Sequence, residues 1–96
     1  MKGPHEYTLQ DLLKTIYNRV DVADAFAEKE VITAYNDVVG ELISKLTRTA
    51  SFRNGVLRVQ LTSAALRQEM SMRKESLVEK INEKLTDTAL TDIIFC

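Results

Sequence analysis

A predicted β-hairpin constrains the fold of this sequence more than any other feature, because both its turn and its register follow from the residues. Asn54-Gly55 is the pair favoured in a two-residue type I′ turn, whose central positions both need a positive φ. Counting outward from this turn places Phe52 opposite Leu57, and Ser51 opposite Arg58. The apolar face then carries Ala50, Phe52, Leu57, Val59 and Leu61, and the polar face carries Thr49, Ser51, Arg53, Val56, Arg58 and Gln60. Because both strands agree on which face is apolar, we expect a single register with that face packed against helices.

The polar face of the hairpin is the first place where we expect a partner, since it is mildly basic and the sequence offers no obvious cover for it. The net charge of −1 hides an asymmetry between the two parts of the chain. Residues 1–44 contain four Lys or Arg against eight Asp or Glu, whereas residues 45–96 contain nine against six. Such a bipolar molecule can present a basic surface to nucleic acid. Chance differences between the halves of a small protein are the alternative explanation.

Length and composition indicate one globular domain. The chain has 96 residues, of which 45% are hydrophobic and 28% charged, and we assign residues 1–96 to a single domain with residues 1–7 flexible. No apolar run approaches the roughly 20 residues of a membrane span, and the N-terminal residues do not resemble a signal peptide. The single Cys96 cannot form an internal disulfide. We therefore expect a cytoplasmic protein without a membrane partner.

Apolar spacing outside the hairpin predicts three helices and a third strand. Gly40 falls inside the second predicted helix, where we expect a neighbouring element to pack closely. Tyr35 on the same helix is expected to be buried, with its hydroxyl hydrogen-bonded or near the surface. Thr62 or Ser63 is expected to cap the third helix. The predicted helices span about residues 8–20, 22–46 and 63–85, and the predicted strands about residues 48–53, 56–61 and 91–95.

These elements predict an α+β fold with the order ααββαβ. The three strands form one mixed or antiparallel sheet, and the helices pack on one face of it. In this arrangement Leu57 and Val59 are expected to lie in the core, and the polar face of the hairpin is expected to face solvent.

No residue pattern indicates an enzyme or a metal site. His5 is the only histidine, and Cys96 has no neighbour that would activate a thiolate. Metal-ligand spacings are absent, and the glycines at positions 3, 40 and 55 cannot form a phosphate loop. We therefore expect a non-enzymatic binding or structural protein, with no catalytic residue, no metal and no cofactor.

Several motifs, in their order along the chain, resemble one known family. Tyr35–Gly40 is similar to a Trp-x-x-Val-Val-Gly signature with Tyr at the Trp position. Asn54–Val59 follows at the expected distance, and Leu61–Met70 is similar to a strand followed by small hydroxyls and a Trp/Leu-x-x-Glu-Leu segment, with Met70 at the last position. The remaining matches are Leu77, Ile81-Asn82 and Ile93–Phe95. Together they resemble the DciA family over about residues 8–96.

This resemblance implies a KH-like α/β domain that helps deliver or operate the DnaB-type replicative helicase of bacteria and that binds DNA. Two departures from the expected pattern stand out. The family is often described with a disordered basic extension, and we expect this chain to be a short form without a basic tail. The Gly-x-x-Gly loop by which many KH domains clamp a nucleic-acid backbone is also missing. Met70–Arg73, at about the place of that loop, is predicted as uninterrupted helix.

For a nucleic-acid-associated accessory domain, Arg53 and Arg58 are the strongest candidate contacts, because the register places both on the polar face. Arg48 at the start of the strand, and Arg67 and Lys74 on the third helix, are weaker candidates. Basic residues at the edge of an apolar stripe more often cover the core with their stems. Without aromatic side chains on the polar face, we expect weak and salt-sensitive binding to DNA or RNA.

The alternative function is a protein-binding adaptor with no direct nucleic-acid contact. An exposed Met72, a free edge of the third strand and the acidic N-terminal helices each offer a surface for a protein partner. A sheet edge also offers a route to a homodimer.

Overall fold

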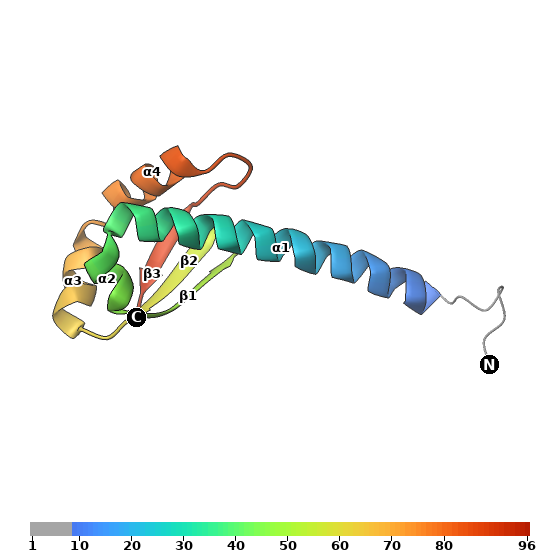
Figure 1. Ribbon diagram of the computed structural model, residues 1–96, viewed down its shortest axis with the longest axis horizontal. Coiled ribbons are helices and arrows are strands. Elements are labelled where there is room, and N and C mark those ends of the chain that lie inside the picture. Colours follow the sequence, from blue (N-terminus) through green and yellow to red (C-terminus); the bar gives the residue numbers. More distant parts are fainter. Residues whose placement is uncertain (1–8) are drawn as a thin grey trace.

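Four helices and a three-stranded sheet form the fold, arranged as shown in Figure 1. The computed structural model describes the backbone from residue 9 to residue 96, and side chains from residue 22 onward. The predicted flexibility of residues 1–7 lies outside the described residues. The elements are α1 (Leu9–Val39), α2 (Glu41–Lys45), β1 (Thr47–Arg53), β2 (Val56–Leu61), α3 (Ala64–Met72), α4 (Lys74–Lys84) and β3 (Asp92–Phe95).

The sheet is mixed and has the order β1-β2-β3. β1 and β2 are antiparallel with Phe52 opposite Leu57 and Ser51 opposite Arg58, as the residue count predicts. β3 runs parallel to β2, which places Ile93 beside Leu57. The predicted α+β class and the predicted hairpin register are therefore confirmed.

The hairpin turn has the expected backbone geometry. Asn54 has a φ of 52° and Gly55 a φ of 81°, so both central positions are in the left-handed region that a type I′ turn needs. At the other end of β1, the register shifts between Thr47 and Thr49. Arg48 is the extra residue of this β-bulge, which sequence alternation did not reveal.

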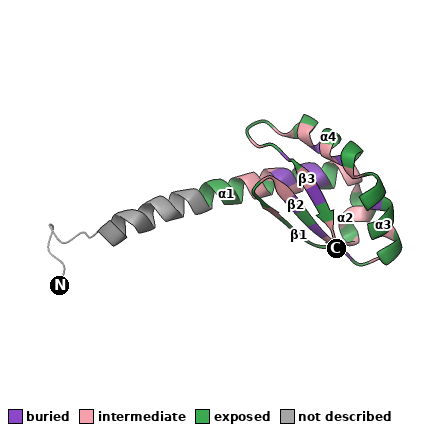
Figure 2. Cartoon of the chain, turned by 180° about the vertical axis from the view of Figure 1, so that it is seen from behind, coloured by how far each residue is buried: buried purple, intermediate pink, exposed green. Residues whose placement is uncertain are grey.

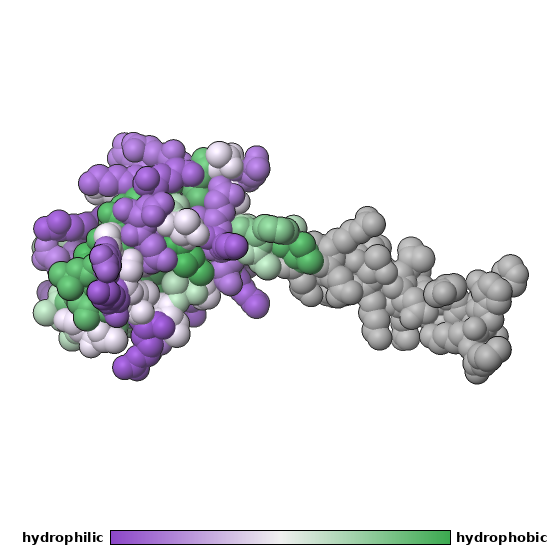
Figure 3. Space-filling model, in the orientation of Figure 1, coloured by the Kyte–Doolittle hydropathy of each residue, from purple (hydrophilic) through white to green (hydrophobic). Residues whose placement is uncertain are grey.

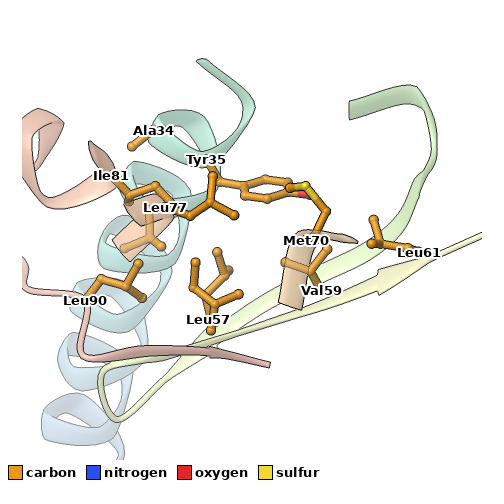
Figure 4. Packing of buried hydrophobic residues seen from close by; sticks show 11 residues of the cluster. Ala34, Tyr35, Leu57, Val59, Leu61, Met70, Leu77, Ile81 and Leu90 are labelled. Carbon is orange, nitrogen blue, oxygen red and sulfur yellow. The ribbon is translucent and has the colours of Figure 1, made fainter. Parts of the chain in front are cut away.

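The core lies between the helices and one face of the sheet. α1 crosses this face, and Figure 2 shows the buried residues where the helix and the strands meet. Figure 4 shows how Tyr35 of α1 and Met70 of α3 reach toward Leu57 and Val59 of β2. Leu57 and Val59 have no exposed surface, as predicted. The buried hydrophobic residues are Val31, Ala34, Tyr35, Leu57, Val59, Leu61, Met70, Leu77, Ile81, Leu90 and Ile93.

The predicted helix boundaries need two corrections in the first half of the chain. The break expected near residue 21 is absent, because α1 continues from Leu9 to Val39. The second predicted helix instead ends at Gly40, which has a φ of 87° and separates α1 from α2. A Cβ at this position would meet nothing within 4 Å, so the expected close packing is wrong. Gly40 is needed for its backbone conformation, which side-chain-bearing residues rarely adopt.

The third predicted helix is two helices. Ser63 caps α3, and its Oγ accepts a hydrogen bond from the Leu66 amide at 3.2 Å, as expected. The helix breaks at Arg73, however, so uninterrupted helix through Met70–Arg73 was a wrong prediction. The break leaves Met72 exposed, as predicted.

Tyr35 links the end of α1 to the start of β1. Its side chain is fully buried and its hydroxyl lies 3.0 Å from Thr47 Oγ1. Thr47 donates its own hydroxyl proton to the Ile43 carbonyl at 2.9 Å, so the Tyr35 hydroxyl is the donor in the first bond. Burial raises the pKa of Tyr35, which keeps the phenol protonated at neutral pH. The predicted burial and hydrogen bond are both confirmed.

Replacing Tyr35 by alanine should lower the free energy of unfolding by about 3 kcal/mol or more, because it leaves a cavity at the centre of the core. Tyr35→Phe keeps the ring and removes only the hydroxyl bond to Thr47, which should cost about 1 kcal/mol. Urea denaturation of both variants measures the difference. Equal stabilities of the alanine variant and the wild type would contradict the central place of Tyr35 in the core.

Alanine substitutions at Gly40 and Gly55 should differ in their effect. Gly40→Ala introduces only backbone strain, of about 1–3 kcal/mol. Gly55→Ala adds a clash, because the new Cβ would lie 2.8 Å from Thr91 Oγ1, which is held by a bond to the Gly55 carbonyl. Denaturation should therefore show a larger loss at Gly55, and a smaller loss when Gly55→Ala is made in a Thr91→Ala background. Additive losses in the double variant would contradict the clash.

Candidate nucleic-acid interface

The face of the sheet that points away from α1 is called here the outer sheet face. Two of its rows cross all three strands, because side chains alternate along each strand and the register aligns them. The first row is Arg53, Val56 and Asp92; the second is Ser51, Arg58 and Ile94; Thr49 and Gln60 form a third across β1 and β2. In Figure 2, which looks at the sheet from the side opposite α1, no helix of the described residues covers this face.

Arg53 and Arg58 lie on the outer sheet face and are both exposed, as the register predicts. They are diagonal neighbours on adjacent strands, which places their Cα atoms about 7–8 Å apart. None of the ion pairs between described residues involves either guanidinium, whereas Lys45, Arg73 and Lys74 each pair with a carboxylate. Two cations at this spacing can contact neighbouring phosphates of a nucleic-acid backbone.

Arg53 has a more acidic environment than Arg58. It lines a groove of about 420 Å³ between α1 and the tip of the hairpin, together with Asp24 and Glu28. Glu28 Oε2 also accepts a hydrogen bond of 3.1 Å from the Phe52 amide, which holds this carboxylate beside β1. Asp24 and Glu28 place negative potential beside Arg53, whereas the carboxylate diagonal to Arg58, that of Asp92, is paired with Lys74.

The three weaker candidates are not gathered with this pair. Arg48 is exposed at the bulge, toward the other end of β1, and Arg67 is exposed on α3 rather than on the sheet. Lys74 begins α4, and its Nζ lies 3.0 Å from Asp92 Oδ1. The hydrogen bond from Lys74, followed by that from the Ile93 amide, lowers the pKa of Asp92. Asp92 is therefore held as a carboxylate paired with Lys74 at the edge of the outer sheet face.

The outer sheet face has no aromatic side chain on any of its strands. Phe52 and Phe95 both belong to rows that face the core, beside Leu57 and Val59 respectively. Bases therefore have no ring on which to stack, and contacts to the sugar–phosphate backbone are the interactions that this face can offer.

Ile94 is a member of this face that the sequence did not single out. It lies beside Arg58 and is partly exposed. The run Asp92-Ile93-Ile94-Phe95 is apolar at three successive positions, so alternation could not show which isoleucine points outward. The parallel pairing of β3 with β2 shows that Ile94 lies on the outer sheet face, because it places Ile94 beside Arg58.

The break at Arg73 places a turn between two helices, at about the place where a Gly-x-x-Gly loop would fall in a KH domain. The residues at this turn include no glycine, and Arg73 pairs with Glu69 of α3 at 2.8 Å. A backbone clamp of the Gly-x-x-Gly kind therefore has no counterpart in its residues. The broader likeness to KH domains stays a prediction.

Other kinds of site find little support in the described part of the chain. Across the residues that the structure describes, no three His, Cys, Asp or Glu side chains gather where they could hold a metal ion. Within the same range, no helix is both long enough and apolar enough to cross a lipid bilayer.

The structure is that of a small α+β domain with an exposed pair of cations on one face of its sheet. The family model for DciA, described as the Dna[CI] antecedent, matches residues 8–95, and the chain belongs to the DciA family. Membership of this family implies an association with the replicative helicase of bacteria. The family consists of helicase-loader accessory domains and is not a known enzyme family. No curated protein matches the chain.

The ion pair between Lys74 and Asp92 gives a measurable pH signature. NMR titration should place the Asp92 midpoint below the ordinary value for aspartate, and Lys74→Met should raise it. Because the folded pKa is lowered, the stability from this pair is present above the unfolded pKa and is lost as the pH falls through the folded pKa. A midpoint unchanged by Lys74→Met would contradict this assignment.

Proposed function

We propose that this chain is a non-enzymatic, single-domain accessory protein of the bacterial cytoplasm that acts with the DnaB-type replicative helicase and contacts DNA through its outer sheet face. The helicase association follows from the family. The DNA contact is supported by one observation above all, the exposed diagonal pair Arg53 and Arg58 on a face without helices.

The chemistry of this face favours binding that is weak and independent of sequence. Arginine forks donate to phosphate oxygens in a bidentate manner, whereas Thr49, Ser51 and Gln60 add only neutral hydrogen bonds. At one edge, Lys74 and Asp92 neutralise each other and so add no net attraction for a polyanion. With so few cations, binding depends on counterion release and falls steeply with salt. RNA presents the same phosphate chemistry, and DNA is favoured by the replication role of the family.

Arg53→Ala/Arg58→Ala should weaken DNA binding and lower the slope of log K against log salt by about 0.7–0.9 for each lost phosphate contact. Fluorescence anisotropy with single- and double-stranded oligonucleotides, titrated with salt, measures both quantities. Arg58→Ala alone should weaken binding more than Arg53→Ala, since Arg53 lies near Asp24 and Glu28.

The matched control is Lys45→Ala/Arg73→Ala, which removes the same charge from two cations that pair with carboxylates away from the sheet, one on α2 and one at the turn between α3 and α4. It should keep most of the salt dependence. An affinity and a slope unchanged by the arginine substitutions would exclude the outer sheet face. If the wild type bound neither form of DNA at low salt, the protein-binding adaptor would become the better explanation.

A further inference from the structure

The ion pair between Lys74 and Asp92 lies at the edge of the outer sheet face, beside the proposed DNA contacts. Asp92 is aligned with Val56 from one side of β2, and Arg53 is aligned with Val56 from the other side. Arg58 lies one row away on the same central strand, so Arg53 and Asp92 are both its diagonal neighbours. Long side chains reach this far across a sheet. A polyanion that contacts the two arginines therefore passes close to the Lys74 ammonium.

Asp92 is the fixed member of this pair and Lys74 is the movable one. Asp92 Oδ1 lies 3.0 Å from Lys74 Nζ and accepts a hydrogen bond of 2.8 Å from the Ile93 amide. The amide bond ties the carboxylate to the backbone of β3, whereas the ammonium stands at the end of a flexible stem. Both side chains are 43% exposed, so water and salt weaken their attraction. An ammonium held in this way can bind a phosphate oxygen once the carboxylate is removed.

Lys74 is distinguished from the other paired cations by its place beside the sheet. The pairs of Lys45 and Arg73 lie on α2 and at the turn between α3 and α4. Figure 3 shows a hydrophilic surface over α4, and the sequence of this helix contains three lysines and three glutamates. A helix with balanced charges gives a polyanion no net attraction. The position of Lys74 next to the arginines, rather than a basic helix, therefore makes it a candidate ligand.

We propose that Lys74 is a third phosphate ligand of the outer sheet face, and that Asp92 limits DNA affinity by occupying it. The inference rests on the proposed function and adds the residue that sets the strength of binding. A phosphate that displaces Asp92 from Lys74 leaves an unpaired carboxylate beside the DNA, so the exchange adds little affinity. Without this carboxylate, Arg53, Arg58 and Lys74 can each donate to a phosphate oxygen. Asp92 thereby keeps the binding weak, which favours rapid release of DNA.

Asp92→Asn tests this role, because it removes the charge and keeps an oxygen that can accept the bond from Ile93. Fluorescence anisotropy with single- and double-stranded DNA oligonucleotides should show an affinity about fivefold or more above that of the wild type at low salt. The slope of log K against log salt should become steeper by about 0.7–0.9, as for one added phosphate contact. Both gains should disappear in Asp92→Asn/Lys74→Met, which lacks the freed ammonium. Gains that persist in this double variant would overturn the proposal, because Asp92 would then act only by repelling DNA.

The matched control is Glu69→Gln, which changes the net charge by the same amount and frees Arg73 away from the sheet. It should leave the affinity and the slope at their wild-type values. An equal gain in this control would overturn the proposal in favour of an effect of net charge. Asp92→Ala is the second variant, since it removes the same carboxylate, and it should give the same gain. Thermal melts of all variants check that the fold is kept.

The outcomes separate this inference from the proposed function. The wild type could bind DNA through Arg53 and Arg58 while Asp92→Asn changes neither the affinity nor the slope. This result would overturn the roles of Asp92 and Lys74 and leave the proposed function standing. If neither the wild type nor Asp92→Asn bound DNA at low salt, both would be overturned.

Discussion

The tight turn at Asn54-Gly55 is the constraint on which the rest of the structure depends. Its left-handed backbone fixes which residue of β1 lies opposite which residue of β2. A shift of one residue would turn Leu57 and Val59 to solvent and move Arg58 into the core, where an unpaired guanidinium is very unfavourable. The core and the outer sheet face are therefore two results of one register, and neither can change without the other.

A second interaction connects this hairpin to the helical layer. The chain of hydrogen bonds from the Tyr35 hydroxyl through Thr47 to the Ile43 carbonyl joins α1, β1 and α2. It holds the start of β1 beneath the end of α1, while Gly40 provides the backbone turn between the two helices. The result is that the face opposite the helices, with Arg58 at its centre, is presented on a rigid support.

Local chemistry explains why much of this could be predicted from the sequence. Turn residues and alternation gave the hairpin register, and the Ser63 cap and the burial of Tyr35 followed from residue type and spacing. The helix boundaries were harder, since Gly40 inside an apolar stripe is compatible with either close packing or a break. The break at Arg73 has no proline or glycine beside it, so the sequence carries no local signal for it.

The candidate site also combines features that one strand reveals with features that only the tertiary structure reveals. The exposure of Arg53 and Arg58 followed from their own strands. The acidic groove beside Arg53, the ion pair of Lys74 with Asp92 and the outward position of Ile94 each involve elements far apart in the sequence. Spacing along one element cannot reveal such neighbours, so the ranking of Arg58 above Arg53 required the tertiary structure.

The hydrogen bond from the Phe52 amide to Glu28 has a consequence for solubility. β1 is an edge strand, and unpaired amides on an edge are templates for strands of other molecules. Here a carboxylate of α1 takes the place that the carbonyl of an added strand would occupy, and the bulge at Arg48 interrupts the regular spacing further along. One side chain and one backbone irregularity together make this open edge a poor template for strands of other molecules.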